Sequence, residues 1–387
     1  MSKITLLTIL LFFTLFPADA QNGIRISQSP FLQNLGPDEV TIVWVADKPS
    51  VGWVEIAPDD GSHFYRQERP KFFDAKNGIK NTSTVHTVRL SGLNPGTRYR
   101  YRVFAQEVLS HVGHKVVYGD VASTAVYQKA PLAFVTSNPE KPTVSFAMVN
   151  DIHGRNDVLE KLVSFCDLKK TDMFLFNGDM VSIFNTEKDV FDGFMTTATK
   201  LFASELPMYY TRGNHETRGS FATSFQQYFS PGANNIYYMF RQGPVCFVIL
   251  DCGEDKPDSD IEYAGITVYD QYRTEQAAWL SEVLKSPEYR DAPFKVVVCH
   301  MPPFGGWHGE QEIADKFVPL LNDAKPDIML CGHLHRYMRN EPKDGVNFPV
   351  IVNSNNSVLQ AEAGDKELKI TITDVSGKEI DRMTIRK

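Results

Sequence analysis

Five short groups of residues in this chain carry side chains that bind divalent metal ions, and each group follows an apolar run. In chain order they are Asp151-Ile152-His153, Gly178-Asp179, Gly213-Asn214-His215-Glu216, His300 and Gly332-His333-Leu334-His335. Carboxylate, amide and imidazole ligands suit mid-size divalent ions. One carboxylate can bridge two such ions, which then hold an oxygen nucleophile between them. The five groups in this order therefore predict a two-metal hydrolase that acts on phosphate esters.

The apolar runs ahead of these groups predict an α/β domain, because strand-like and helix-like patterns alternate along this part of the chain. Strands are expected at residues 144–149, 173–176, 208–210, 245–250, 295–299 and 327–330, and helices at residues 158–166, 187–203, 275–284 and 311–321. In open α/β sheets, functional groups gather at the carboxyl ends of the strands. The side chains expected to converge on one edge are Asp151, Asp179, Asn214, His300 and His333.

Residues from about 22 to 135 follow a different pattern. Short runs rich in β-branched and aromatic residues alternate apolar with polar positions, and turn residues separate them. This pattern predicts an all-β sandwich. The stretch Leu90–Tyr99 resembles the strand-turn-strand signature of fibronectin type III domains, in which a Tyr after the Pro-Gly turn packs at a sheet corner. Core packing is the favoured role of these aromatic residues, and carbohydrate binding is the alternative.

The chain therefore divides into three parts. We expect a signal peptide at residues 1–20, a β-sandwich domain at residues 21–138 and an α/β domain with two packed mixed sheets at residues 143–387. The two prolines of Asn138-Pro139-Glu140-Lys141-Pro142 are typical of a linker between domains. Strand-like runs after Phe348 are expected to complete a second sheet.

The N-terminus has the features of a secretory signal. Met1-Ser2-Lys3 is basic, Ile4–Phe16 is apolar, and Ala18-Asp19-Ala20 has the small-residue pattern of a cleavage site. The apolar run is shorter than the roughly 20 residues of a membrane-spanning helix. We expect a protein that is exported to the periplasm or secreted and that keeps no stable membrane span after cleavage. An uncleaved N-terminal anchor is the alternative.

Net charge and cysteine content limit the classes of partner and the kinds of cross-link that the chain can have. A net charge of −7 argues against nucleic acid or an anionic membrane as the main partner. The chain has 5 cysteines, an odd number, and Cys246, Cys299 and Cys331 lie inside apolar runs. Buried free thiols are therefore favoured over disulfides, and a zinc cluster is disfavoured because no two cysteines have CxxC spacing.

The pattern D-x-H, G-D, G-N-H-[DE], H and G-H-x-H resembles the calcineurin-like metallophosphoesterase superfamily from about residue 143 to residue 336. With a β-sandwich ahead of it, the chain most resembles the purple acid phosphatase branch. The resemblance implies two divalent metal ions, of Mn, Zn or Fe. It assigns Asp179 as their bridge and the other ligands as Asp151, His153 and His335 for the first ion and Asn214, His300 and His333 for the second.

The resemblance also implies catalytic roles. Asp179 and Asn214 belong to the catalytic set as metal ligands, and His215 stands near the leaving oxygen as a general acid or as a charge partner for the transition state. Glu216 is expected to orient His215.

Two positions depart from the purple enzymes. In that branch the first group is D-x-G and the second is G-D-x-x-Y, whose Tyr ligates iron and gives the purple colour. Here His153 ends the first group and Ser182 stands at the tyrosine position. An imidazole would thus replace the phenolate at the first metal. We expect a colourless enzyme with Mn, Zn or Fe(II).

Four residues near the ligand groups are candidates for substrate contact. Trp307 and His308 follow two glycines in a loop after His300 and could reach a substrate ring or phosphate; a surface loop with a packed Trp is the alternative. Arg155 and Arg212 flank ligand groups, as does Arg336, and structural ion pairs are the alternative for each. The polar segment 251–273 could form a lid, although a solvated insertion is favoured.

The favoured function is an exported phosphatase that hydrolyses phosphomonoesters by attack of a metal-bound hydroxide. A phosphodiesterase or nucleotide hydrolase with the same dimetal site is the first alternative. The third hypothesis is an inactive surface protein that binds glycans through the sandwich. It is disfavoured because all seven metal-ligand positions are filled. The expected partner is a phosphorylated small molecule, and the oligomeric state stays open.

Overall fold

The computed structural model describes residues 23–229 and 235–387. The predicted signal peptide at residues 1–20 lies outside the described residues. Within the two described stretches, every helix is too short or too polar to cross a bilayer. All 5 cysteines are free thiols, four of them buried, which confirms the prediction from their apolar surroundings.

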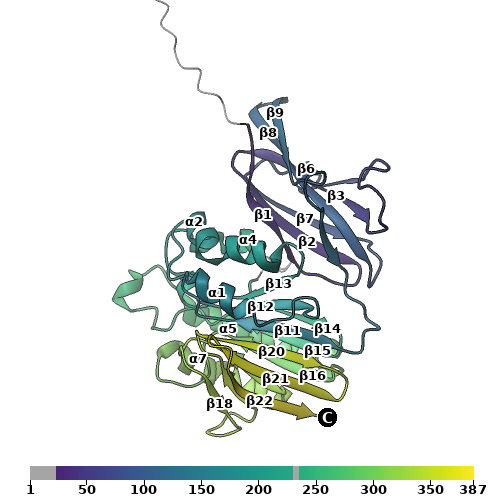
Figure 1. The fold of residues 1–387 in the computed structure, drawn as a ribbon. Helices are drawn as coiled ribbons and strands as arrows, with labels where there is room; N and C mark the ends of the chain where they lie inside the picture. The colour runs from purple at the N-terminus through teal and green to yellow at the C-terminus, as the bar shows by residue number, and fades with distance from the viewer. Residues whose placement is uncertain (1–22, 230–234) are drawn as a thin grey trace, which may run out of the picture.

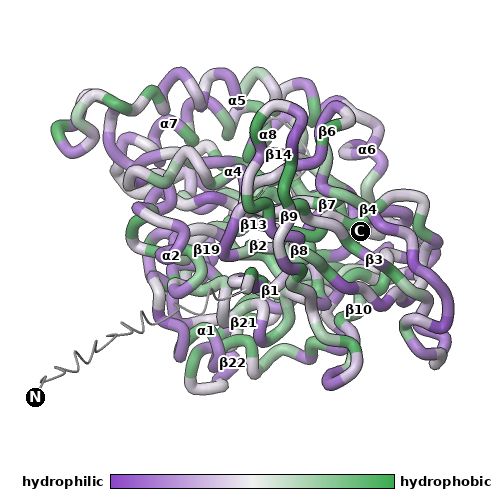
Figure 2. Tube along the Cα trace, turned by 90° about the horizontal axis from the view of Figure 1, so that it is seen from above, coloured by the Kyte–Doolittle hydropathy of each residue, from purple (hydrophilic) through white to green (hydrophobic). Residues whose placement is uncertain are grey.

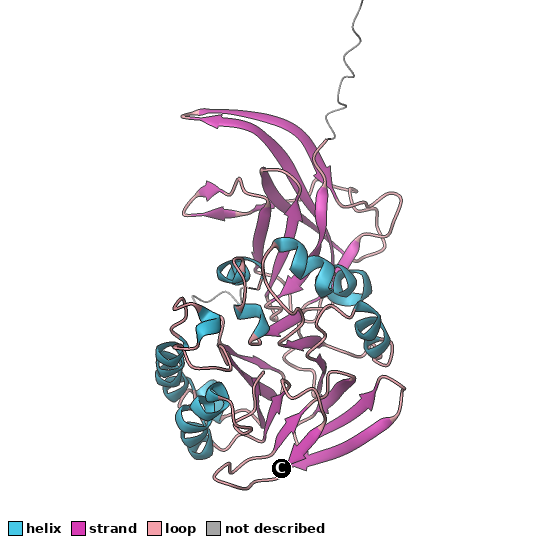
Figure 3. Cartoon of the chain, turned by 90° about the vertical axis from the view of Figure 1, so that its left-hand side faces the viewer, coloured by secondary structure: helices cyan, strands magenta, loops and turns pink. Residues whose placement is uncertain are grey.

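The N-terminal part is a β-sandwich, as its alternating strands predicted (Figures 1 and 3). One sheet has the order β1 (Ile26–Gln33), β2 (Glu39–Ala46) and β7 (Val85–Ser91). The other has the order β10 (Leu132–Val135), β8 (Arg98–Val112), β3 (Ser50–Pro58) and β4 (Lys71–Phe73), with β9 (Lys115–Ser123) paired to β8. A short hairpin joins β5 (Ala75–Lys76) to β6 (Ile79–Lys80). The core between the two sheets contains Trp44, Val54 and Tyr101.

The remainder of the chain builds two six-stranded mixed sheets. The first has the order β13 (Met208–Thr211), β12 (Met173–Asn177), β11 (Val144–Val149), β20 (Ser357–Ala363), β21 (Glu367–Asp374) and β22 (Glu379–Arg386). The second has the order β14 (Tyr238–Gln242), β15 (Val245–Leu250), β16 (Phe294–Cys299), β17 (Ile328–Cys331), β19 (Val350–Val352) and β18 (Met338–Asn340). The C-terminal strands were expected to complete a second sheet, but only β19 does so. β20 to β22 extend the first sheet instead, because β20 pairs with β11.

The two sheets pack face to face through one apolar core, and helices cover both outer faces (Figure 1). Over the first sheet lie α1 (Asn156–Val163), α2 (Glu187–Val190), η1 (Phe191–Met195), α3 (Thr196–Ala198), η2 (Thr199–Ala203) and α4 (Phe225–Tyr228). Over the second lie α5 (Tyr269–Val283), α6 (Pro287–Arg290), α7 (His308–Lys316) and α8 (Val318–Ala324). Green and purple alternate along α5 and α7 in Figure 2, as expected of helices with one face on a sheet.

Two helices differ most clearly from their predicted bounds. The helix expected at 275–284 begins at Tyr269, six residues earlier than its pattern indicated. The helix expected at 311–321 is broken between Lys316 and Val318. Pro319 lies in the first turn of α8, where its missing N–H costs no hydrogen bond, but it cannot sit inside a continuous helix.

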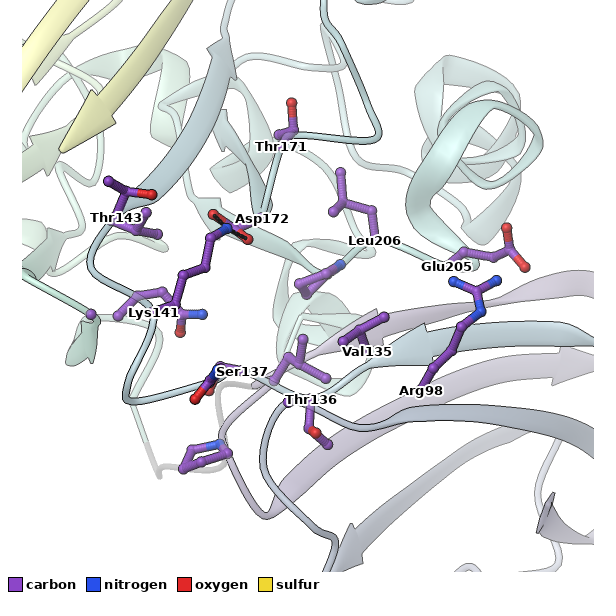
Figure 4. Close-up of a pocket in the computed structure, with 18 of the residues that line it drawn as sticks. Arg98, Val135, Thr136, Ser137, Lys141, Thr143, Thr171, Asp172, Glu205 and Leu206 are labelled. Carbon is purple, nitrogen blue, oxygen red and sulfur yellow. Dashed lines mark hydrogen bonds and ion pairs between the residues drawn. The ribbon is translucent and has the colours of Figure 1, made fainter. Parts of the chain in front are cut away.

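The sandwich packs on the helical side of the first sheet. The Tyr101 hydroxyl donates to the Ser204 carbonyl at 2.6 Å, and the Ser204 hydroxyl donates to the Pro30 carbonyl at 2.6 Å. A cavity of about 1080 Å³ lies between the two parts beside the linker. Figure 4 shows Lys141 of the linker paired with Asp172 there, at 2.5 Å. None of the proposed metal ligands lines this cavity.

Candidate metal centre

The ligand groups follow parallel strands of both sheets. Asp151 comes two residues after β11, Asp179 two after β12, and Asn214 three after β13; these three strands are parallel neighbours in the first sheet. His300 directly follows β16 and His333 comes two residues after β17, parallel neighbours in the second sheet. The carboxyl-terminal ends of these strands therefore meet at one place, as predicted, but they come from two sheets and not from one edge.

The structure gathers these side chains into two groups that share one carboxylate. Asp151, His153, Asp179 and His335 present ligand atoms that all lie within 4.8 Å of one another. Asp179 also forms a group with His300 and His333, within the same limit. This division is the one that the resemblance implied, with Asp179 in both groups.

The first group surrounds Oδ1 of Asp151. His335 Nε2 lies 3.1 Å from this oxygen, and His153 Nε2 lies 3.2 Å from His335 Nε2. The other oxygen of Asp151 accepts from the Asn150 side chain at 2.6 Å and from the His333 amide at 2.9 Å. These two donors turn Oδ1 toward the imidazoles.

The second group surrounds Oδ2 of Asp179. His300 Nε2 lies 3.1 Å from this oxygen, because the Asn177 carbonyl accepts a hydrogen bond from His300 Nδ1 at 2.7 Å and fixes the ring. His333 Nδ1 lies 3.1 Å from the amide oxygen of Asn214, which places Asn214 beside this group. A backbone partner on the far nitrogen is the usual way in which a metal-binding imidazole is oriented.

The side chains fit divalent ions. Oδ1 of Asp151 and Nε2 of His300 are buried, and no group in the described part of the chain meets either atom in hydrogen-bond geometry, although His335 and Asp179 lie 3.1 Å from them. Buried polar atoms rarely stay without a hydrogen-bond partner, and a metal ion would supply the missing partner. Imidazole, carboxylate and amide oxygen together suit Mn, Zn or Fe.

The backbone is strained where these ligands lie. Five of the seven expected ligands have φ in the left-handed region, between 49° and 70°. They are Asp151, His153, Asp179, His333 and His335. Each such residue costs about 1–3 kcal/mol, and strain of this kind clusters at functional sites.

The pKa values of the candidate ligands are shifted in different directions. Burial lowers the pKa of His153 and of His333 to about 4, against the pull of the nearby carboxylates. Burial also opposes the charged form of His300, but Asp179 and Asp151 outweigh it and raise its pKa to about 10. The pKa of Asp179 is lowered, because His300 and His215 outweigh its burial. Two imidazoles are thus neutral ligands, and the shared carboxylate is charged.

His215 lies beside both groups. Its Nε2 is 3.8 Å from Asp179 Oδ2, and its Nδ1 is 2.8 Å from the Ser182 carbonyl. A carbonyl only accepts, so Nδ1 carries the proton of this contact. The prediction that Glu216 orients His215 is wrong: the Ser182 carbonyl has that role.

Glu216 instead holds the loop that carries Asp179. Its buried carboxylate accepts from the amides of Asp179 at 2.9 Å, Met180 at 2.7 Å and Gly213 at 2.9 Å, and from the Tyr210 hydroxyl at 2.9 Å. By accepting these hydrogen bonds, the Glu216 carboxylate stabilises the loop conformation that directs Asp179 toward the two ligand groups. The sequence signal for this role is weak, because it depends on the three-dimensional fit of two separate loops.

The four residues expected near the substrate have structural partners or stand at the surface. The guanidinium of Arg155 donates to the carbonyls of Ile152, Asp151 and Asn355 at 2.7–3.0 Å. Arg212 pairs with the buried Asp251 at 2.8 Å. His308 Nε2 lies 2.7 Å from Asp270 Oδ1, and Trp307 is half exposed. The two arginines thus fit the structural alternative.

Three site features were not foreseen. The Ser182 hydroxyl lies 3.2 Å from His153 Nδ1. The residue at the tyrosine position thus supports His153, the imidazole expected in place of that tyrosine. Buried Glu310 places an unpartnered oxygen 3.8 Å from His333 Nε2. Arg218 lies beside His215, held by Glu254 of the 251–273 segment. The favoured interpretation of that segment as a solvated insertion is wrong for residues 251–255, which are buried.

Comparison with known proteins agrees with this geometry. Residues 144–337 match calcineurin-like phosphoesterases, and residues 28–116 match the N-terminal domain of purple acid phosphatases. The chain belongs to the calcineurin-like phosphoesterase family. Purple acid phosphatase 21 of Arabidopsis thaliana is 28% identical over 334 residues, which cover 79% of this chain and 65% of that protein. Purple acid phosphatase 18 of the same plant is 23% identical over 340 residues, covering 82% of this chain and 67% of that protein.

A solved structure has the same fold as this member of the calcineurin-like phosphoesterase family. The purple acid phosphatase PPD1 from yellow lupin (Lupinus luteus) seeds superposes with a TM-score of 0.66 at 16% identity, covering 92% of this chain and 74% of that one. The sandwich and the two-sheet domain thus recur together. The match to Purple acid phosphatase 21 spans less than two thirds of that protein's length.

Proposed function

We propose that this chain is an exported dinuclear-metal phosphatase that hydrolyses phosphomonoesters. The observation that carries the proposal is the pair of side-chain groups that share Asp179, in which Oδ1 of Asp151 and Nε2 of His300 find no hydrogen-bond partner among the described residues. The names of the relatives support a phosphatase, and the apolar run at the N-terminus supports export.

The residues would divide the work as follows. Asp151, His153 and His335 would hold one divalent ion, Asn214, His300 and His333 the other, and Asp179 both. When bound, the two ions would act as Lewis acids on the phosphoryl group and lower the pKa of water enough to give a hydroxide nucleophile at neutral pH.

The charge of the site favours an anionic substrate although the chain is acidic. Two divalent ions bring about +4, and the carboxylates of Asp151 and Asp179 offset about two of these charges, so the centre keeps about +2 before a nucleophile binds. A phosphate ester is attracted by this local charge, whatever the sign of the whole chain.

His215 would act on the leaving oxygen of the ester. Its Nε2 lies near the shared carboxylate, and its ring is held by the Ser182 carbonyl. In its protonated form the ring also carries a proton on Nε2, which it would donate to the departing oxygen or share with it in a hydrogen bond. Its side chain is 28% exposed, which leaves the ring open to substrate.

A direct assay tests the proposal. The purified protein, loaded with Mn, Zn or Fe(II) and analysed for metal content, should hydrolyse p-nitrophenyl phosphate faster than bis(p-nitrophenyl) phosphate, and EDTA should abolish both activities. A preference for the diester would favour a phosphodiesterase or nucleotide hydrolase. Full activity after complete metal removal, or about two equivalents of metal with no turnover of either ester, would overturn the proposal.

A further inference from the structure

Arg218 presents one nitrogen toward the candidate metal centre while the rest of its guanidinium is fixed. Nε and Nη2 lie 2.8 and 2.9 Å from the two carboxylate oxygens of Glu254, and Nη2 also lies 3.3 Å from Asp255. Among the described residues, no carboxylate pairs with Nη1, which lies 3.4 Å from His215 Nε2. A guanidinium held on two nitrogens by one carboxylate has a defined orientation, so the direction of Nη1 is set.

Glu254 is itself held rigidly. It is 1% exposed and accepts from the Thr217 hydroxyl at 2.7 Å and from the Tyr263 hydroxyl at 2.9 Å. Burial opposes its charge, but the hydrogen bonds from Arg218 and Thr217 outweigh burial and lower the pKa of Glu254. The carboxylate therefore stays charged, and its two hydrogen bonds hold Arg218 in place.

The backbone around Glu254 is also tied down. The side chain of Arg273, which is fully buried, donates to the carbonyl of Glu254 and, at 2.8 Å, to that of Cys252. The amide of Gly309 at the start of α7 donates to the Asp255 carbonyl at 2.9 Å. Residues 251–255 are thus buried and tied to their neighbours, and Glu254 among them holds Arg218 beside His215.

We propose that Arg218 contacts the substrate, donating from Nη1 to an unesterified phosphoryl oxygen, and that Glu254 is the residue that positions it. This inference rests on the proposed phosphatase function. Nη1 is available because the Arg218 side chain is 28% exposed and its contact with His215 is long. It is also close to the chemistry, because the same His215 nitrogen lies 3.8 Å from the shared Asp179.

This donor selects for monoesters. A phosphomonoester has three unesterified oxygens and a phosphodiester two, so a monoester can satisfy an additional directed donor that a diester leaves without a partner. Hydrogen bonds to charged groups are strong, and a donor that loses its partner weakens binding. Glu254 and Asp255 together outweigh the single charge of Arg218. Its contribution is therefore the directed hydrogen bond and not net attraction.

The test compares two esters in several variants of the full, metal-loaded protein. Arg218→Gln should lower kcat/KM for p-nitrophenyl phosphate about 10- to 100-fold, the range expected for one hydrogen bond to a charged group, and for bis(p-nitrophenyl) phosphate by no more than about threefold. Inhibition by inorganic phosphate should weaken in parallel. Glu254→Gln keeps the guanidinium but loosens it, so it should shift the ester ratio in the same direction by less.

Two further variants separate binding from folding. Arg218→Lys keeps the positive charge but lacks the planar guanidinium that binds two oxygens at once. Its ratio of monoester to diester kcat/KM should lie between those of the wild type and Arg218→Gln, and it provides the test if Arg218→Gln is unstable. Arg382→Gln removes an arginine from a surface pair with Glu379 on β22 and should change neither ester. Equal losses on both esters in variants with wild-type metal content would overturn the role of Arg218 alone. A wild-type protein inactive on both esters would instead overturn the proposed function.

Discussion

The two ligand groups that share Asp179 differ in how far they are buried. In the first group the side chain of His335 is 48% exposed and that of His153 is 16% exposed. In the second group His300 is fully buried and His333 is 9% exposed. The first group therefore faces solvent, whereas the second is part of the interior between the two sheets.

The supports of the two groups differ in the same sense. The Ser182 hydroxyl, on an exposed residue, lies beside the His153 ring, whereas the buried Asn177 carbonyl holds His300. A ring that is fixed by buried backbone has fewer ways to move than one fixed by a surface hydroxyl. We therefore expect a first metal ion that exchanges readily and a second that is held firmly, and each prediction below tests that asymmetry.

The largest effect is expected where the groups join. Asp179→Asn removes the shared charge, so both ions should bind weakly and kcat/KM on p-nitrophenyl phosphate should fall on the order of 10³-fold, the upper end of what the loss of one group that stabilises transition-state charge costs. Metal analysis and steady-state kinetics measure this. A variant with wild-type turnover and two bound ions would contradict the role of Asp179 as a bridge.

Removing one imidazole from each group should separate them. In the metal-free protein, His300→Ala leaves Asp151 and Asp179 buried without their partner and should cost about 3–5 kcal/mol of unfolding free energy. His335→Ala, at a half-exposed position, should cost about 1 kcal/mol or less. Urea unfolding gives both values. Excess metal should restore part of the activity of His335→Ala only, and equal stability of the two variants would remove the asymmetry.

Metal removal should proceed in two steps. Timed exposure of the loaded protein to EDTA should release one equivalent quickly and the second slowly, because the first group opens to solvent and the second does not. Metal analysis of aliquots follows the two steps, and activity should fall with the first. Release of both ions at one rate would mean that burial does not control exchange here.

A smaller effect is expected from the support of the first group. Ser182→Ala deletes the hydroxyl beside His153 Nδ1 and should weaken binding of the first ion by about tenfold, at the low end for loss of a group that orients a metal ligand. Isothermal titration with Zn²⁺ measures this. Ser164→Ala, at an exposed hydroxyl after α1, is the control, and an equal change in both variants would assign no role to Ser182.

The visible absorption spectrum also tests the first ligand group. With Ser182 beside His153 instead of a tyrosine, the iron-loaded protein should lack an intense visible charge-transfer band. An absorption spectrum of the native holoprotein decides this, and a purple protein would show that a tyrosine from elsewhere reaches the first metal.

Much of the fold followed from local patterns. The alternation in the N-terminal strands, the apolar runs before each ligand group and the linker prolines all depend on neighbours in the chain. The sheet that β20 to β22 join did not follow in this way, because it depends on pairing with the distant strand β11. The break between α7 and α8 was missed although Pro319, a local signal, lies at it.

The sequence alone determined the chemistry expected of the site: seven candidate ligands of suitable type, in groups that each follow a strand, because side-chain chemistry and strand ends are local properties. Only the tertiary structure decided how these residues are supported and exposed. It moved Glu216 from His215 to the loop of Asp179, and it brought Glu254 to Arg218. Burial and hydrogen-bond partners come from segments far apart in the chain, and no local pattern records which of those segments will meet.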